Sequence, residues 1–171
     1  MLRMVKMSEK SPAKSIIDEL PSGVKNNLIS GETVVSYLKT FEIVERPNYI
    51  ILTNQRVLFF DEKMLWRYAF KSLPLEKMLQ LRANRGAVLW GDISFKMEDG
   101  TVVLLEKVDR DKMKGFIDAF ETAYNKIAVE PISIKHNRNL LDRETWEFNK
   151  PSEILFRGPS SNQPETSESK K

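Results

Sequence analysis

Seven short segments rich in β-branched and aromatic residues follow one another between residues 33 and 108, and this succession restricts the chain to a mainly β fold. Turn-forming residues separate the segments, among them Asn54-Gln55, Arg85-Gly86 and Asp99-Gly100. Strands at this spacing are typical of antiparallel sandwiches and barrels. The predicted strands cover residues 33–43, 48–53, 56–61, 65–71, 77–84, 87–97 and 101–108.

One long amphipathic helix, residues 110–127, is predicted directly after the strands. Asp109 is a suitable N-cap, apolar residues then recur at intervals of three and four, and Pro131 marks the end of the pattern. Acidic and basic residues balance on its polar side, whereas membrane-surface helices favour lysine and arginine there. We therefore expect this helix to cover one side or end of a small barrel. Its apolar stripe consists of Met113, Phe116, Ile117, Phe120, Ala123, Tyr124 and Ile127.

The remaining segments give the predicted domain organisation. Residues 1–14 are expected to form a flexible arm, and residues 15–130 one domain that begins with short helices. Residues 131–157 hold apolar pairs without a clear period, and we expect them to pack on this barrel or on a second copy, or to form a separate partner-binding arm. Residues 158–171 have almost no apolar side chains and are expected to be disordered.

The composition argues against an enzyme. The 171 residues include no cysteine and one histidine, His136, which lies outside the predicted barrel. A thiolate nucleophile, a sulfur-ligated metal and a histidine-rich metal site are therefore excluded. No phosphate-binding or dinucleotide-binding glycine motif occurs. We expect a protein without catalytic activity, metal or cofactor.

The charge and hydropathy patterns restrict the partners and the location. The 27 basic and 24 acidic residues nearly cancel, which makes nucleic acid an unlikely partner. No apolar run is long enough to span a membrane, and the first ten residues do not form a signal peptide. Together with the absence of cysteine, these features predict a cytoplasmic protein.

Four stretches resemble the prokaryotic PH-like (pleckstrin-homology-like) domains, including the YokE-like branch, and more distantly the GRAM domains. They are ISGETVVSYL (29–38), IILTNQRVLFF (50–60), FKSLPLEKMLQL (70–81) and WGDISF (90–95). The resemblance covers residues 28–127. It implies the PH-like superfold, an α+β arrangement in which a C-terminal amphipathic helix packs on a seven-stranded, partly open antiparallel barrel.

The polar residues between the second and third predicted strands have two interpretations. Asn54, Gln55 and Arg56 are either ligand-binding side chains or the turn of a hairpin. Asparagine tolerates the positive φ of a tight turn, and an apolar run lies on each side. We therefore predict a hairpin, in which Arg56 pairs with a nearby carboxylate.

Four basic residues are candidates for contact with an anionic partner. By strand alternation they point outward, although acidic residues nearby in sequence would weaken their field and leave an ordinary solvated face. The predicted patch comprises Arg67, Lys71, Arg82 and Arg85.

Two tryptophans are candidate interface anchors. Trp90 lies on the strand face opposite Ile93, where it either meets a partner or is covered by the N-terminal helices or by residues 131–157. Trp146 is the largest apolar side chain of the C-terminal extension and its expected anchor.

The function predicted from these features is that of a non-catalytic PH-like interaction module. It would bind a protein, either a peptide or another copy of itself, at an exposed strand edge beside the C-terminal helix. The alternative is a peripheral module that binds a membrane surface or an anionic lipid headgroup through the four basic residues.

Soluble phosphoinositide headgroups are expected not to bind in the loop formed by residues 42–48. This loop carries Glu42 and Glu45 against one cation, Arg46, so it repels a phosphorylated ligand. Calorimetry with a soluble headgroup should show no binding in the micromolar range. Binding in that range that disappears in Arg46→Ala would contradict this expectation.

Overall fold

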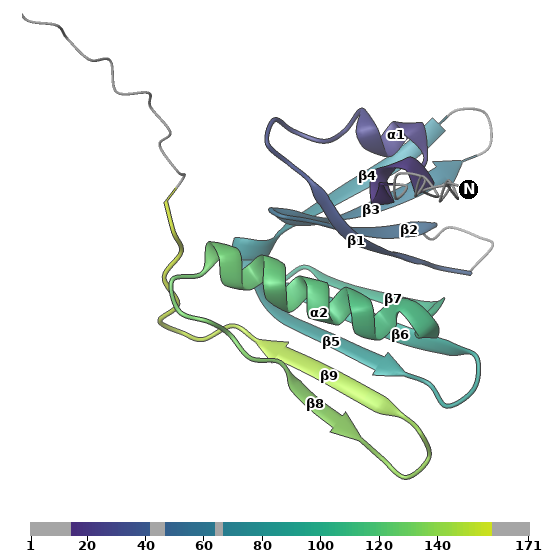
Figure 1. Ribbon diagram of the computed structural model, residues 1–171, viewed down its shortest axis with the longest axis vertical. Helices are drawn as coiled ribbons and strands as arrows, with labels where there is room; N and C mark the ends of the chain where they lie inside the picture. Colours follow the sequence, from purple (N-terminus) through teal and green to yellow (C-terminus); the bar gives the residue numbers. More distant parts are fainter. Residues whose placement is uncertain (1–14, 42–46, 64–66, 159–171) are drawn as a thin grey trace, which may run out of the picture.

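The computed structural model describes residues 15–41, 47–63 and 67–158, without the side chains of residues 62, 63 and 67–70 (Figure 1). The predicted arm at residues 1–14, most of the predicted acidic loop and the predicted tail from residue 159 lie outside this description. The elements are η1 (Ile16–Glu19), α1 (Ser22–Lys25), β1 (Val34–Lys39), β2 (Tyr49–Thr53), β3 (Arg56–Lys63), β4 (Arg67–Pro74), η2 (Leu75–Lys77), β5 (Met78–Arg85), β6 (Trp90–Met97), β7 (Val102–Asp109), α2 (Arg110–Ile127), β8 (Lys135–Arg138) and β9 (Glu144–Asn149).

The strands form two antiparallel sheets, which confirms the predicted mainly β fold. The first has the order β1-β2-β3-β4 and the second the order β7-β6-β5-β9-β8. The sheets meet at one corner, where Thr40 bridges Val108 and the Phe41 N–H donates to the Lys107 carbonyl at 3.0 Å. They do not close into a barrel, and α2 packs across the open side (Figure 1).

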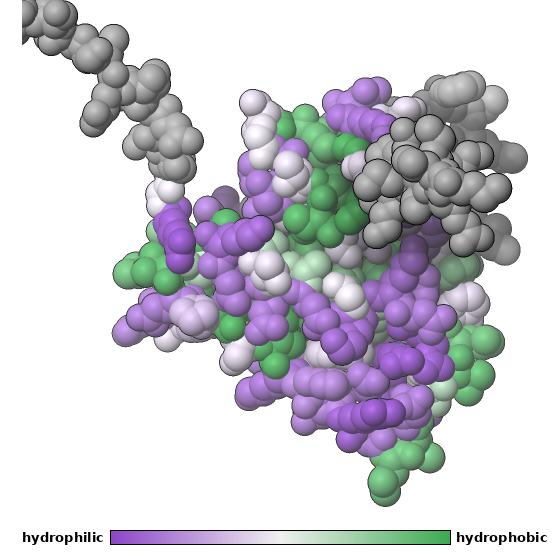
Figure 2. All heavy atoms as spheres, in the orientation of Figure 1, coloured by the Kyte–Doolittle hydropathy of each residue, from purple (hydrophilic) through white to green (hydrophobic). Residues whose placement is uncertain are grey.

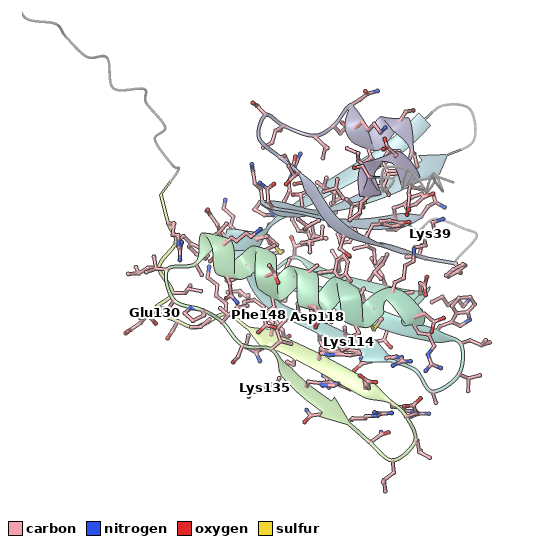
Figure 3. All side chains as sticks on the ribbon, in the orientation of Figure 1. Lys39, Lys114, Asp118, Glu130, Lys135 and Phe148 are labelled. Carbon is pink, nitrogen blue, oxygen red and sulfur yellow. The ribbon has the colours of Figure 1, made fainter. Side chains whose placement is uncertain are left out.

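Helix α2 has the bounds that the sequence pattern predicts. The Asp109 carboxylate accepts a hydrogen bond from the Asp111 N–H and caps its first turn. Its apolar stripe contacts β1 and β2 of one sheet and β5, β6 and β7 of the other. Phe120 packs edge-on against Phe148 of β9, which lies against the helix (Figure 3), with 5.4 Å between the ring centroids. The helix thus completes a core shared by both sheets.

The short N-terminal helices cover the opposite face of the first sheet. Leu20 and Val24 pack there with Ile51, Leu58 and Phe60 in a second apolar cluster. Strand β2 is therefore buried on both faces, since its alternate residues face the central core. This explains why residues 49–52 read as a continuous apolar run.

The hairpin between β2 and β3 is confirmed, and its polar side chains bind the protein itself. Asn54 accepts a hydrogen bond from the Thr33 N–H and donates one to the Gly31 carbonyl. Arg56 donates to both carboxylate oxygens of Glu32, each at 2.8 Å. Asn54 and Arg56 thus tie the chain that follows α1 to the first sheet.

The Glu32 carboxylate is buried within this network. Thr53 Oγ1 and the Ile29 N–H also donate to it, at 2.7 and 3.0 Å. Burial alone raises the pKa of Glu32, but the hydrogen bonds from Arg56, Ile29 and Thr53 outweigh it and hold the pKa below its ordinary value.

Residues 131–157 contain a β-hairpin that extends the second sheet. Strand β9 pairs with β5 from Gln80↔Asn149 to Arg85↔Glu144, and β8 pairs with β9. Glu144, Trp146 and Phe148 are buried, whereas all of β8 is exposed. The sequence pattern did not predict these two strands, because β8 is a polar edge strand without an apolar face.

The sixth strand also begins later than predicted. It starts at Trp90, and Leu89, which lay within the predicted strand at residues 87–97, is exposed in the loop before it. Gly86 shapes this loop, because a Cβ there would lie 2.2 Å from the Trp90 carbonyl oxygen.

Replacing Phe120 by alanine is expected to lower the free energy of unfolding by about 3–5 kcal/mol, because the side chain is fully buried between helix and sheet. Denaturant titration measures this change. Lys126→Ala on the exposed side of α2 is the matched control and should stay within about 0.5 kcal/mol of the parent. An unchanged midpoint for Phe120→Ala would show that α2 is not part of the core.

Replacing Glu32 by glutamine is expected to lower the free energy of unfolding by about 1.5–3 kcal/mol at neutral pH, because charged hydrogen bonds are lost. The folded-state pKa of Glu32 is depressed, so this stabilisation is present above the ordinary glutamate pKa and disappears as pH falls through the folded value. The difference in free energy of unfolding between Glu32→Gln and the parent should therefore become smaller at acidic pH.

The exposed Lys114–Asp118 pair supplies the control for this experiment (Figure 3). Asp118→Asn should change the unfolding free energy by less than about 1 kcal/mol. The free energy of unfolding of Glu32→Gln and of the parent would be compared well below and well above the ordinary glutamate pKa. An equally large difference at both pH values would show that the carboxylate charge does not stabilise the fold.

Candidate functional site

Three of the four basic residues of the predicted patch have described side chains, and these belong to different sheets or different strand faces. Lys71 is exposed on β4 of the first sheet, and Arg82 is exposed on β5 of the second. Arg85 lies three residues beyond Arg82 and so points to the other face of that strand. Arg67 lies opposite Lys63 at the start of β4, and its side chain is outside the described part.

The described cations of this set lie near carboxylates. Asp99 has a lowered pKa, first because Thr101 donates to it and further because of the charge of Lys71. The pKa of Glu147 is lowered first by the hydrogen bond from Asn149 and further by the charge of Arg82. The negative charges of these two carboxylates weaken the positive field that an anionic partner would meet.

Arg85 belongs to a cluster that holds the C-terminal hairpin on β5. Its Nη1 donates to Glu144 Oε1 at 2.9 Å, and the other Glu144 oxygen lies 2.9 Å from His136 Nε2. The His136 ring stacks on Trp146 with an angle of 2° between the planes. The spacing in sequence gave no sign of this cluster, because its members lie on three strands that pair only in the folded chain.

The two candidate tryptophan anchors differ in exposure. Trp146 is 3% exposed and belongs to the core of its own chain. Trp90 is 39% exposed, and its ring lies 4.6 Å from the ring of Phe41. Within the described residues, this contact is with the chain after β1, and not with the N-terminal helices or residues 131–157 that were expected to cover it.

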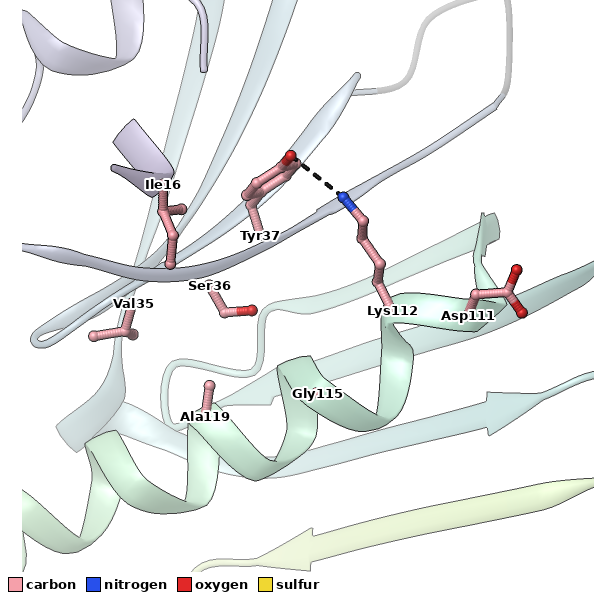
Figure 4. A pocket seen from close by; sticks show the side chains of 8 residues that line it. All are labelled: Ile16, Val35, Ser36, Tyr37, Asp111, Lys112, Gly115 and Ala119. Carbon is pink, nitrogen blue, oxygen red and sulfur yellow. Dashed lines mark hydrogen bonds between the residues drawn. The ribbon is translucent and has the colours of Figure 1, made fainter. Parts of the chain in front are cut away.

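A groove lies between β1 and α2 and has a volume of about 280 Å³ (Figure 4). Strand β1 provides one wall and α2 the other, and η1 contributes the side chain of Ile16 at one end. The lining residues are Ile16, Val35, Ser36, Tyr37, Asp111, Lys112, Gly115 and Ala119.

Small residues on α2 create the hollow. Gly115 and Ala119 are one helical turn apart on the side that faces β1 (Figure 4). A Cβ added at Gly115 would have no heavy atom within 4 Å. Glycine lowers helix stability by about 1 kcal/mol relative to alanine, so its presence within the strong pattern of α2 was the available sequence signal for this site.

Part of the backbone of strand β1 faces the groove. The Thr40 N–H donates to Asn48 before β2, whereas the Phe41 N–H donates to Lys107 of β7. Hydrogen-bonding groups alternate along a strand, so those of Tyr37 and Lys39 point away from β2. Among the described residues, no strand pairs with this edge of β1 ahead of the bridge between Thr40 and Val108, which takes up the end of the strand.

Polar groups lie at the mouth of the groove. Tyr37 Oη donates to Glu19 at 2.6 Å, and Lys112 Nζ donates to Tyr37 Oη at 3.3 Å. The hydrogen bond to Glu19 is the main reason that the pKa of Tyr37 is raised. The ammonium group of Lys112 also lies 4.7 Å from the centre of the Tyr37 ring. The groove therefore combines an apolar hollow, an open strand edge and a cation.

The described residues contain neither a cluster of metal ligands nor a membrane-spanning helix. Across residues 15–41, 47–63 and 67–158, no three His, Asp or Glu side chains converge in a way that would hold a metal ion. None of the helices in this part of the chain combines the length and the apolar composition needed to cross a membrane.

Comparison with known proteins identifies the family. The sequence model of the bacterial PH domain matches residues 28–122. A protein of Archaeoglobus fulgidus, described as uncharacterized, is 33% identical over 140 residues, which cover 81% of this chain and 73% of that protein. A solved structure of a DUF1696 family protein with a pleckstrin-homology domain, from Shewanella loihica PV-4, has a TM-score of 0.46 and 13% identity, and covers 63% of this chain and 98% of that one. Because the family match spans more than half of the residues, this chain belongs to the bacterial PH domain family, as its four sequence stretches predicted.

Proposed function

We propose that this protein is a non-catalytic binding module that takes up an extended segment of a partner protein in the groove between β1 and α2. Membership of the bacterial PH domain family supports a binding module in general. The observation that carries the finer proposal is the open edge of β1 beside a hollow in α2.

Main-chain hydrogen bonds would supply the first part of recognition. Tyr37 directs its N–H and C=O groups away from β2, so an extended peptide can pair with this part of β1 as an added strand. Such pairing does not depend on the sequence of the peptide. It also protects a strand edge that would otherwise remain open to non-specific association.

Side chains would supply the specificity. An added strand directs every second side chain toward α2, where Gly115 and Ala119 leave space for an apolar residue. The Lys112 ammonium group at the mouth favours a carboxylate nearby on the peptide. We therefore expect the bound segment to be extended, with an apolar residue close to an acidic one.

Two alternatives for the partner follow from the same chemistry. The segment belongs either to a different protein or to a second copy of this chain, and light scattering of the purified protein separates the two. Binding of an anionic lipid headgroup through Arg67, Lys71, Arg82 and Arg85 is less favoured, because Lys71 and Arg82 lie near carboxylates and Arg85 is paired with Glu144.

Filling the hollow is expected to abolish peptide binding without loss of stability. Gly115→Leu places a side chain in the groove, and the substitution raises helix propensity by up to about 1 kcal/mol. A library of random peptides would be selected on the parent protein, and the selected peptides measured on both proteins by fluorescence anisotropy. We expect at least a tenfold weaker affinity for Gly115→Leu, about 1.4 kcal/mol, together with an unchanged or higher melting temperature.

Lys114→Leu provides the matched control, because it adds the same side chain to the same helix outside the groove lining. It should leave the affinity unchanged. The amide signal of Tyr37 should shift when the selected peptide binds to the parent. Peptides that bind the parent and Gly115→Leu equally well, or a library that yields no binder, would contradict this function.

A further inference from the structure

Two loops project from the end of the molecule where α2 begins, and each carries a pair of exposed apolar side chains. The β5–β6 loop comprises residues 86–89 and the β8–β9 loop residues 139–143. Figure 2 shows an apolar projection at the lower end of the molecule, where the β8–β9 loop lies in Figure 1. The exposed fractions are 76% for Val88, 65% for Leu89, 105% for Leu140 and 67% for Leu141.

Arg110 holds the two loops in a fixed relation. Its Nη1 donates to the carbonyls of Ala87 and Val88, at 2.6 and 2.9 Å. Its Nη2 lies 3.7 Å from Asp142 Oδ2 in the other loop. Because this arginine is the first residue of α2, both apolar pairs are attached to the helix that organises the core.

A polar cleft of about 450 Å³ separates the loops. Its lining holds two cations, Arg85 and Arg143, and two carboxylates, Asp92 and Glu144; Arg85 and Glu144 pair with each other, and the cleft has no excess of either sign. The partly exposed ring of Trp90 lies at the base of the β5–β6 loop, against Phe41. The surface therefore has two apolar tips, a polar space of mixed charge between them and an aromatic residue behind them.

We propose that this end of the molecule, the loop-tip surface, inserts into the interface of a lipid bilayer that carries no net charge. Val88, Leu89, Leu140 and Leu141 would enter the boundary between headgroups and acyl chains. The cleft between the loops would accommodate zwitterionic headgroups, which present both signs of charge. Trp90 would lie at headgroup level, where tryptophan is favoured. This surface is distinct from the peptide groove.

The shape of the surface favours a bilayer over a protein partner. Two separate apolar tips on either side of a polar cleft leave gaps against a flat protein surface, whereas lipids fill such gaps. The balanced charges also distinguish this surface from the basic patch considered above. Insertion of apolar side chains is weakly sensitive to salt, whereas attraction to an anionic surface is screened by it.

Flotation with phosphatidylcholine vesicles tests the proposal. The full chain is expected to float with the vesicles at both low and high salt. The double variants V88S/L89S and L140S/L141S should each lower the ratio of bound to free protein by at least about tenfold, because two exposed apolar side chains are lost from the inserted surface. Both variants should keep the parent melting temperature, because the four side chains are exposed.

The control is V129S/L155S, which removes two exposed apolar side chains beyond the opposite end of α2. It should float as the parent does. Absence of flotation of the parent, equal flotation of the loop variants, or loss of flotation on adding salt would overturn the proposal. If the parent self-associates without lipid and the loop variants do not, the membrane proposal is overturned and the surface is an interface between copies of this chain.

Discussion

The packing of α2 against both sheets is the interaction on which the rest of the structure depends. The sheets meet through the bridge between Thr40 and Val108, and β4 continues into β5 through η2. Elsewhere the helix fills the space between them, with Phe116, Ile117 and Phe120 fully buried. A two-sided core of this kind removes far more apolar surface from water than either sheet could alone. Residues of this helix line the groove, and its first residue, Arg110, holds together the two loops of the loop-tip surface.

Local patterns predicted most of this architecture because they reflect local physics. The spacing of three and four residues gave the bounds of α2, and the turn residues gave the hairpins at Asn54 and Gly100. The β8–β9 hairpin was missed, because the polar strand β8 has no apolar face and β9 finds its partner β5 about sixty residues earlier. Pairing over such distances leaves no period in the sequence.

The candidate site was predicted less completely than the fold. The expectation of a strand edge beside the C-terminal helix came from the family resemblance, and the sequence did not reveal which edge or which helix residues define the groove. Arg85 belongs to a residue type that usually lies on the surface, yet its guanidinium group forms a salt bridge with Glu144. Contacts of this kind depend on strand register, since a shift of one residue would place Arg85 on the other face of the sheet.

The pairing of β9 with β5 has a consequence for where the folding unit ends. The family match stops at residue 122, within α2, before the buried residues Tyr124, Trp146 and Phe148. A fragment cut at that boundary would expose the edge of β5 from Gln80 to Arg85 that β9 covers, next to an uncovered apolar face. Such an edge is a template for aggregation. The region matched by the family model therefore ends before the packed core of this chain does.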